Sequence, residues 1–357
     1  MKLFDLIKLL VPALALAACA SPSWYAQAIS GHYGLMRDRV DIEEMLASED
    51  TDPELARELE LAVEIREFAA SGLGLADNES YRQFVRTGQD AVTWNVVAAP
   101  EFSLEPRRWC FLVSGCVSYR GYFERSDAEG FGRKLGAEGW DVAVSPAVAY
   151  STLGWFEDPL LDTMFRYSDE QLAAFIFHEL AHQQLYVRGD TAFNEAYATF
   201  VEETGVEIWL RATERQDGLR EWQQKQSASI QFNQLLLETR KHLDSLYGSQ
   251  APDSEKRAVK EKTFRELAER YQKLVRDEWA GHDYYSGWFE NEPNNARLAL
   301  ANSYRGGVCA FSRLFESAGG DMERFHRLAA VKAGASEQER SEWLSQPCGN
   351  IAPDPDL

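Results

Sequence analysis

The chain has 357 residues, 45 % of them hydrophobic, which excludes a mainly disordered protein and allows two sub-domains around a sizeable core. Lys and Arg number 37 against 57 Asp and Glu, so the formal net charge is −20. Such a charge repels phosphate backbones and anionic lipid surfaces, and nucleic acid is therefore not an expected partner.

The N-terminus resembles a bacterial lipoprotein signal peptide. A weakly positive start precedes an apolar run at residues 9–17, which is shorter than the roughly 20 residues that a membrane span needs. Small residues follow, so we expect cleavage after Ala18 and lipidation of Cys19. The residue after Cys19 is Ala20 and not Asp, which favours transport to the outer membrane, with the anchored protein facing the periplasm. A buried N-terminal helix is the alternative.

Residues 24–88 are expected to form helices. Apolar residues recur at spacings of three and four in this segment, and Asp52-Pro53 is a helix-start signal. The period changes at residue 91, after which Val, Tyr, Trp and Phe become frequent and indicate a small mixed sheet with a helix at 126–139. The strands are predicted at 91–100, 109–123 and 140–156.

The segment FIFHELAHQQ, residues 175–184, carries the most informative pattern in the chain. It lies inside a predicted helix at 168–189, and residues four apart on a helix project from the same face. His178 and His182 can therefore occupy two neighbouring corners of one tetrahedral zinc site. Glu179 would lie beside the metal, where it can act as general base on water. Two structural histidines in a core are the alternative.

A catalytic zinc ion needs a third protein ligand, which we expect from the next helix. That helix starts near Phe193, and Asn194-Glu195 resembles the corresponding helix start in zincins whose third ligand is glutamate. Twelve residues separate His182 from Glu195 and 19 separate it from Glu202, and 19 is the thermolysin-like spacing. We predict Glu195 as the ligand. Glu202, on the same face, is expected to support a ligand or to bind the amine of a substrate.

The C-terminal half is predicted to be mainly helical. Two long charged amphipathic stretches, 216–247 and 254–279, flank YGSQAPDS and are expected to form a helical hairpin. Shorter helical segments and a tail follow. The chain is thus expected to comprise a signal peptide (1–18), an N-terminal helical segment (19–90), a catalytic core (91–213), a helical region (214–348) and a tail (349–357).

The cysteines are compatible with disulfides. Without Cys19, four of the five remain, an even number in a compartment that permits disulfides. Two local bridges are one of three connectivities, and free buried thiols are the alternative. No CxxC spacing indicates a cysteine metal site. The four residues are Cys110, Cys116, Cys309 and Cys348.

Four stretches carry a family resemblance, namely GCVSYRGYF, AYSTLGWFEDPLL, HELAHQQLYVRGDTAFNEAYATFVE and NNARLALANSYRGGVCAFSRLFESAGGDMERF. Together they resemble the predicted bacterial aminopeptidases, a group of envelope-associated zincins. The resemblance runs from about residue 20 to residue 335. It implies an α+β, zincin-like fold, in which a small mixed sheet precedes the HExxH helix, and a zinc peptidase acting on peptides.

Zincins bind the substrate backbone along an edge strand and stabilise the transition-state oxygen with a Tyr or His donor. Residues 149–156 are expected to be that strand, with a buried strand as the alternative. The substrate-binding residues within it are expected to be Tyr150, Ser151 and Thr152. The donor is expected to be Tyr304. The other candidates for this role are His282, Tyr284 and Tyr285.

Two other functions fit parts of the sequence. Glu179 with His182, and Glu323 with His326, are ExxH pairs, which a di-iron helical bundle requires. That function leaves His178 without a role, and metal analysis would separate one zinc from two irons per chain. A non-catalytic envelope lipoprotein is the third hypothesis. It would be favoured if Glu179→Gln protein bound zinc and hydrolysed peptides unchanged.

Overall fold

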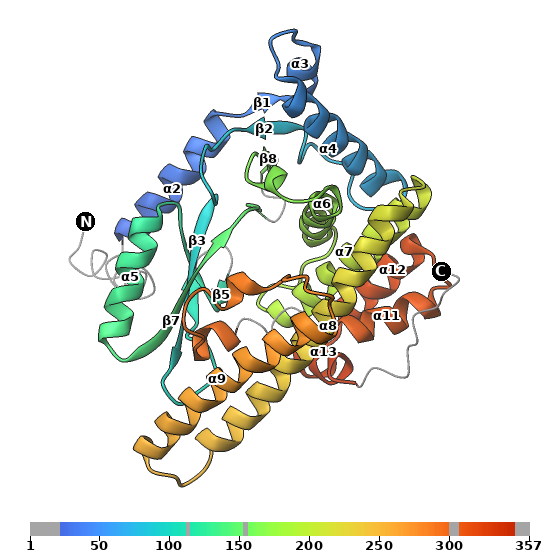
Figure 1. Ribbon diagram of the computed structural model, residues 1–357. Coiled ribbons are helices and arrows are strands. Elements are labelled where there is room, and N and C mark those ends of the chain that lie inside the picture. Colours follow the sequence, from blue (N-terminus) through green and yellow to red (C-terminus); the bar gives the residue numbers. More distant parts are fainter. Residues whose placement is uncertain (1–21, 112–114, 153–155, 300–306, 347–357) are drawn as a thin grey trace, which may run out of the picture.

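The computed structural model describes residues 22–111, 115–152, 156–299 and 307–346. Small sheets occupy the first half of the chain and helices the second (Figure 1), in agreement with the predicted α+β class. The helices are α2 (Pro22–Arg37), α3 (Ile42–Ala47), α4 (Pro53–Ser71), α5 (Arg125–Ala137), α6 (Asp169–Gln184), α7 (Thr191–Ala212), α8 (Gln216–Tyr247), α9 (Asp253–Asp277), α11 (Val308–Ser317), α12 (Met322–Ala333) and α13 (Glu337–Leu344). The strands are β1 (Val40–Asp41), β2 (Gln83–Val85), β3 (Thr93–Pro100), β4 (Trp109–Phe111), β5 (Gly115–Val117), β6 (Arg120–Tyr122), β7 (Trp140–Ala147) and β8 (Leu160–Leu161).

Three small sheets contain the strands. β2 pairs antiparallel with β1 and parallel with β8, β3 pairs antiparallel with both β6 and β7, and β4 pairs with β5. The β3–β7 pair is the longest, running from Thr93↔Ala147 to Pro100↔Trp140. Because the strand order is β6-β3-β7, β7 lies at an edge of its sheet.

β3 is covered on both faces, which explains its unbroken apolar sequence. Successive side chains of a strand point to opposite faces. Val96 and Ala98 accordingly belong to one hydrophobic cluster, whereas Val97 and Ala99 belong to another. A strand buried on both faces shows a continuous apolar run instead of an alternation, as the sequence of β3 does.

The segment expected to be one strand at 109–123 is divided into β4, β5 and β6. A disulfide joins Cys110 to Cys116 across the β4–β5 pair, so one of the local bridges considered from the sequence is present. Cys309 is disulfide-bonded as well. The hairpin that leads into β6 is therefore held covalently.

The expected edge strand at 149–156 is wrong over its described part. β7 ends at Ala147, and residues 149–152 are not strand. The physical reason is the buried carboxylate of Asp158, which accepts hydrogen bonds from the backbone N and from Oγ1 of Thr152 at 3.0 and 2.7 Å. These bonds turn the chain back on itself.

The N-terminal segment is helical in α2, α3 and α4, as the periodicity predicts. The side chain of Asp52 caps α4 by accepting hydrogen bonds from the backbone N of Glu54 and Leu55. The strands β1 and β2 lie in the same segment and were not expected. β2 forms because Phe84 pairs with Leu160, a partner far along the chain that no local pattern reveals.

α6 and α7 lie at the centre of the molecule and pack against each other (Figure 1). The side chain of Ser168 caps α6 by accepting from the backbone N of Gln171, as the sequence predicts. α6 ends at Gln184 and not at Gly189, because Leu185 is already extended. The reversal into α7 is tight because the side-chain amide of Asn194 bonds both the N and the O of Val187, at 2.7 and 2.8 Å.

The predicted helical hairpin is confirmed in α8 and α9. α8 runs diagonally across the molecule past α7, and α9 returns beside it (Figure 1). The hairpin has a hydrophobic cluster of its own, which includes Phe232 and Tyr271. Lys260 of α9 ties it to the sheet by an ion pair of 2.6 Å with Asp141 of β7. In the described part of the chain, every helix is too short or too polar to cross a bilayer.

Candidate metal centre

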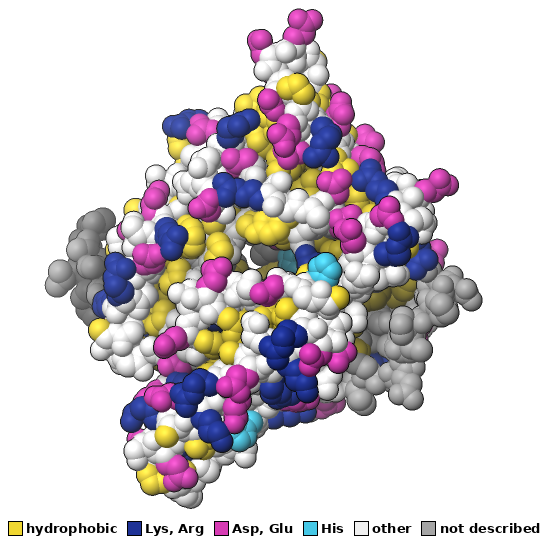
Figure 2. Space-filling model, viewed as in Figure 1, with side chains coloured by type: hydrophobic (Ala, Val, Ile, Leu, Met, Phe, Trp, Pro, Cys, Tyr) yellow, Lys and Arg dark blue, Asp and Glu magenta, His cyan; other side chains and the backbone are white. Residues whose placement is uncertain are grey.

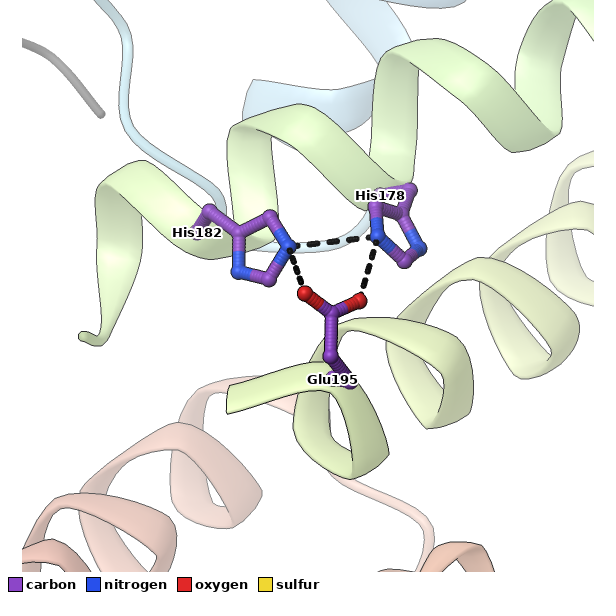
Figure 3. A group of neighbouring side chains, drawn as sticks. All are labelled: His178, His182 and Glu195. Carbon is purple, nitrogen blue, oxygen red and sulfur yellow. Dashed lines mark hydrogen bonds and ion pairs between the residues drawn. The ribbon is translucent and has the colours of Figure 1, made fainter. Parts of the chain in front are cut away.

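α6 and the N-terminal part of α7 bring together three side chains that could hold a metal ion (Figure 3). The Nε2 atoms of His178 and His182 lie 3.2 Å apart. Oε2 of Glu195 lies 3.5 Å from Nε2 of His178, and Oε1 lies 3.8 Å from Nε2 of His182. Among the described residues, this is the one group of three or more His, Cys, Asp or Glu whose ligand atoms all lie within 4.8 Å of one another. These are the three ligands that the sequence predicts.

The donor set fits a zinc ion. Donors placed tetrahedrally around zinc, at bonds of about 2.0–2.1 Å, lie roughly 3.3 Å from one another. The measured separations of 3.2, 3.5 and 3.8 Å are close to that value. Two imidazoles and one carboxylate are also the protein ligands of many catalytic zinc sites, which leave the fourth position to water.

The ionisation states of two of the three side chains favour metal binding. The third, His178, must release a proton to a metal, because the hydrogen bonds and charges of Glu195 and Glu202 outweigh burial and raise its pKa above the usual value. Burial and the charge of His178 lower the pKa of His182 to about 4, so its imidazole is neutral at pH 7. Burial raises the pKa of Glu195, but the hydrogen bond from His178 and the charges of both histidines outweigh it, and the pKa lies below its usual range. Neutral imidazole and ionised carboxylate are the forms that bind metals.

Glu202 lies on the other side of His178 from the cluster. Its Oε2 is 2.9 Å from Nδ1 of His178. A hydrogen bond from Nδ1–H to a carboxylate leaves the lone pair on Nε2 and orients the ring toward the metal. Glu195 therefore belongs to the group of side chains that could hold a metal ion, whereas Glu202 bonds the other ring nitrogen of His178.

Glu179 follows His178 on α6 and lines the same cavity. Burial raises the pKa of Glu179 to about 7, with the charge of His178 opposing this effect and that of Glu195 adding to it. Ser151 also forms a hydrogen bond with this carboxyl. A carboxyl group whose pKa is near neutrality can both accept a proton and return it, which is the property of a general base that later acts as an acid.

The three side chains lie in the wall of a cavity of about 760 Å³. The surface is hollowed at the centre of the molecule (Figure 2). α6 and α7 form one wall, the ends of β5 and β7 form another, and α8 adds Trp222 and Lys225. Such a volume is in the range of small-molecule and peptide sites.

The cavity is acidic. Four glutamates line it, and Lys225 is the single Lys or Arg among the described lining residues. Lys225 donates a hydrogen bond to Oε1 of Gln171, and burial lowers its pKa against the charges of Glu202 and Glu170. The net charge favours a cationic group on a bound molecule.

Two of the three predicted substrate-binding residues of the 149–152 segment reach the cavity. Tyr150 and Ser151 line it, whereas Thr152 does not and bonds Asp158 instead. Asp158 is 1 % exposed and also accepts a hydrogen bond of 3.2 Å from Gln183 of α6. The segment is thus attached to the metal-binding helix.

The predicted donor Tyr304 and the predicted lipidation site Cys19 lie outside the described residues. Of the other donor candidates, Tyr285 lines the cavity, and His282 and Tyr284 do not.

Two tyrosines near the cluster were not assigned a role from the sequence. Tyr119 follows β5 and Tyr186 follows α6, and both line the cavity. The ring of Tyr186 lies 6.3 Å from that of His182. Tyr119 is part of GCVSYRGYF, one of the stretches that resemble the aminopeptidase family, but nothing local connects this stretch to a helix some 60 residues later.

The second ExxH pair, considered above for a di-iron site, is not assembled. His326 donates from Nε2 to the O of Leu73 at 2.8 Å and accepts at Nδ1 from the hydroxyl of Tyr197, also at 2.8 Å. Both ring nitrogens are therefore occupied. The side chain of Glu323 is 79 % exposed. His326 is a hydrogen-bonded residue of the core.

Comparison with known proteins identifies a family but no characterised relative. No curated protein and no solved structure matches the chain. A family model described as "Putative aminopeptidase" matches residues 23–344. The match includes both helices of the metal centre, the sheets and most of the helical second half. Because it extends over most of the sequence, the chain belongs to this aminopeptidase family.

Proposed function

We propose that the protein is a zinc-dependent peptidase that removes N-terminal residues from peptides. The family supports peptidase activity. The observation that carries the zinc-dependent mechanism is the cluster of His178, His182 and Glu195, whose ligand atoms lie within 4.8 Å of one another beside Glu179 and at a cavity. Two imidazoles, one ligand carboxylate and one free carboxyl are the parts that metal-assisted peptide hydrolysis needs.

Each residue of the site has a chemical role in this proposal. His178, His182 and Glu195 would hold the metal, and Glu202 would keep His178 in the binding tautomer. A bound zinc ion would polarise water and the scissile carbonyl. Glu179 accepts a proton from the attacking water and returns it to the nitrogen of the leaving amine. From the sequence alone, Tyr304 is the candidate donor of a hydrogen bond to the carbonyl oxygen.

The charge of the cavity supports action at the N-terminus. A free N-terminal amine is a cation at neutral pH, and a buried cation needs an anionic partner. Glu202 and Glu203 line the cavity on the α7 wall beside the ligands. We propose that Glu202, besides supporting His178, attracts the amine of the substrate.

Metal analysis and peptide hydrolysis test the zinc peptidase together. We expect one zinc per chain, sharply lower metal content in His182→Ala, and full metal content in Glu179→Gln with hydrolysis reduced by at least about a hundredfold. Zinc-loaded Glu179→Gln that hydrolyses peptides like the wild type would contradict the mechanism and favour a non-catalytic lipoprotein. Two irons per chain would favour the di-iron function.

Blocked and free peptides separate the two modes of cleavage. An aminopeptidase releases N-terminal residues one at a time and loses activity on N-acetylated peptides. Glu202→Ala should reduce the rate on free peptides more than any residual rate on acetylated ones. Equal wild-type rates on both forms of one peptide would defeat the aminopeptidase proposal and leave the zinc site unaffected.

We also propose that the mature protein is a lipoprotein of the cell envelope, anchored at the outer membrane and facing the periplasm. The support is the apolar run and the small residues before Cys19. Mass spectrometry of the N-terminal peptide should show a lipidated Cys19, and Cys19→Ala should leave the membrane fraction. A Cys19→Ala protein that stays in the membrane with an unchanged N-terminal mass would contradict the anchor.

A further inference from the structure

Tyr119 lines the same cavity as α6 and α7 but comes from a different part of the fold. It occupies the short connection between β5 and β6, whereas His178 and Glu179 lie on α6. All three side chains line the same cavity. Tyr119 keeps 39 % of its surface accessible, because the cavity that it borders admits water. Tyr119 and α6 therefore border the same space, in which a bound molecule would lie.

The hydroxyl of Tyr119 has no hydrogen-bond partner among the described residues. Burial, together with the charges of Glu195 and Glu179, raises the pKa of this phenol above its usual range. Because Tyr119, Glu179 and Glu195 all line one cavity, the phenol borders the same space as the metal cluster and the proposed general base. It stays protonated at neutral pH and can donate when an acceptor arrives.

The backbone on both sides of Tyr119 is firmly held. On one side, the Cys110–Cys116 disulfide joins the two strands of the β4–β5 hairpin. On the other side, Arg120 pairs with Val96 in the sheet, and its guanidinium lies over the ring of Phe131 at 4.6 Å. A donor on a rigid support needs little reorganisation during a reaction.

Two other tyrosines of the described cavity wall, Tyr150 and Tyr186, are less well placed. The hydroxyl of Tyr150 is bonded to Nδ1 of His32 at 3.2 Å. Tyr186 follows α6 on the same wall as the histidines, and of the two glutamates only Glu195 acts on its pKa. Of these three tyrosines, Tyr119 is the one that combines a position outside α6 and α7, an available hydroxyl and an electrostatic effect from both glutamates.

We infer that Tyr119 is a catalytic residue, whose hydroxyl donates a hydrogen bond to the oxygen of the scissile carbonyl as that oxygen becomes negative. This inference rests on the proposed function. The water oxygen bonds to the carbonyl carbon, Glu179 takes the proton of that water, and the π electrons move onto the carbonyl oxygen beside Tyr119. When the C–N bond breaks, the electron pair returns to re-form the carbonyl, and Glu179 gives its proton to the amine nitrogen. Tyr119 keeps its own proton throughout.

Tyr119→Phe removes only the hydroxyl and is the decisive variant. We expect kcat to fall by about 10²–10³, because a lost oxyanion donor costs that much. KM should stay within about threefold, and zinc content and the unfolding temperature should match the wild type. Tyr186→Phe, a tyrosine of the same cavity, is the matched control and should keep kcat within about threefold.

A second readout does not depend on turnover. A phosphinic peptide carries a tetrahedral anionic phosphorus group in place of the scissile carbonyl, so it mimics the charge of the transition state. Calorimetry should show that Tyr119→Phe weakens its binding to the zinc-loaded protein by about a hundredfold, and Tyr186→Phe by less than about threefold. An acetylated substrate amide without that charge should bind both variants equally.

The outcomes separate this inference from the proposed function. If Tyr119→Phe keeps the kcat and the phosphinate affinity of the wild type, the role of Tyr119 is overturned while peptide hydrolysis stands. The same holds if kcat and phosphinate affinity fall in Tyr304→Phe and not in Tyr119→Phe. A fall in kcat with an equal fall in bound zinc would make Tyr119 structural and overturn it as well. If the wild type binds the phosphinate without hydrolysing peptides, the ratio of the phosphinate affinities of the wild type and Tyr119→Phe tests the role of Tyr119 by itself. A wild type that does neither overturns both proposals.

Discussion

At the scale of single residues, the two nitrogens of His178 assign different roles to the two glutamates of α7. Nε2 faces Glu195 at 3.5 Å, and Nδ1 faces Glu202 at 2.9 Å. The two nitrogens of one imidazole cannot both bind the same ion. A carboxylate at Nδ1 would therefore affect the metal only by orienting the ring through its hydrogen bond. The residue spacing alone favoured Glu202, and the orientation of the ring places Glu195 among the ligand atoms.

Removing the carboxylate behind His178 should weaken metal binding without abolishing it. We expect Glu202→Ala to lower zinc affinity by about 10–100-fold, in a competition with a chromogenic chelator. Glu202→Gln keeps an acceptor for the Nδ1–H and should lose less. Glu221→Ala, an exposed glutamate of α8, is the control and should match the wild type. Unchanged affinity in Glu202→Ala would show that the bond to His178 does not support the metal.

The buried His326 should matter for stability and not for metal. His326→Ala leaves the hydroxyl of Tyr197 and the O of Leu73 without partners, at a cost of about 2–4 kcal/mol in the free energy of unfolding. Urea unfolding measures this change, and zinc content should not alter. His242→Ala, an exposed histidine of α8, should change the free energy by less than about 0.5 kcal/mol. Metal loss in His326→Ala would restore the second ExxH pair as a ligand candidate.

The contribution of His326 should also depend on pH. Burial lowers its pKa, and the hydrogen bond to Leu73 opposes this only in part. The unfolded chain, with a histidine pKa near 6.5, therefore binds the proton more readily than the folded one. The contribution of His326 to the free energy of unfolding is therefore complete above about pH 6.5 and is lost as the pH falls below that value. The difference in unfolding free energy between wild type and His326→Ala should shrink from pH 7.5 to pH 5, and a constant difference would contradict this.

At the scale of elements, the close packing of α6 and α7 determines how the ligands meet. Gly205 of α7 lies against the buried Leu73 and against Phe177, the neighbour of His178 on α6. A Cβ at Gly205 would lie 2.7 Å from Cδ1 of Leu73 and 3.1 Å from Cδ2 of Phe177. Both distances are shorter than ordinary contacts, so a side chain at this position would push the two helices apart.

Gly205→Ala should therefore destabilise the protein although alanine favours helices. Overpacking costs about 1–3 kcal/mol and the gain in helix propensity is about 1 kcal/mol, so we expect a net loss of up to about 2 kcal/mol. Zinc affinity should fall as well. Gly136→Ala in α5, where nothing lies within 4 Å of the added Cβ, should be neutral or stabilising. Urea unfolding of both variants tests the comparison, and equal effects would contradict it.

At the scale of the whole molecule, the α8–α9 hairpin bridges the two walls of the cavity. α8 packs on α7 and lines the cavity through Trp222 and Lys225. α9 reaches the far end of the β3–β7 pair, where Nζ of Lys260 contacts Oδ2 of Asp141 at 2.6 Å and the O of Glu101 at 3.0 Å. The hairpin therefore links the wall that holds the metal ligands to the wall that holds the sheet.

The Lys260 contact should be worth more than an exposed ion pair on the same helix. The side chains of Lys260 and Asp141 are 11 % and 17 % exposed. Those of the ion pair between Lys262 and Glu266 are 68 % and 53 % exposed. Lys260→Ala leaves Asp141 without its cationic partner and should cost about 2–4 kcal/mol of unfolding free energy, whereas Lys262→Ala should cost less than about 0.5 kcal/mol. Chemical denaturation of the two variants measures both values. Equal costs would show that the hairpin is held by its apolar contacts alone.

Local patterns determined the helices and the ligand chemistry of this protein. The Ser168 cap, the 216–247 helix and the spacing of His178 and His182 each depend on residues that lie within a few turns of one another. A helix places such residues on one face whatever surrounds it. For that reason α6, with its two histidines on one face, and the helical hairpin could be predicted from the sequence.

The tertiary structure alone decided what depends on distant segments. β2 pairs with β8 across some 75 residues, Asp158 turns the 149–152 segment away from a strand, and the β5–β6 connection brings Tyr119 to the cavity that Glu179 lines. The ring orientation of His178 likewise follows from the packing of α7 on α6. Periodicity and spacing describe the order of residues along one element, but such contacts arise only when separate elements pack, and no local pattern specifies which elements meet.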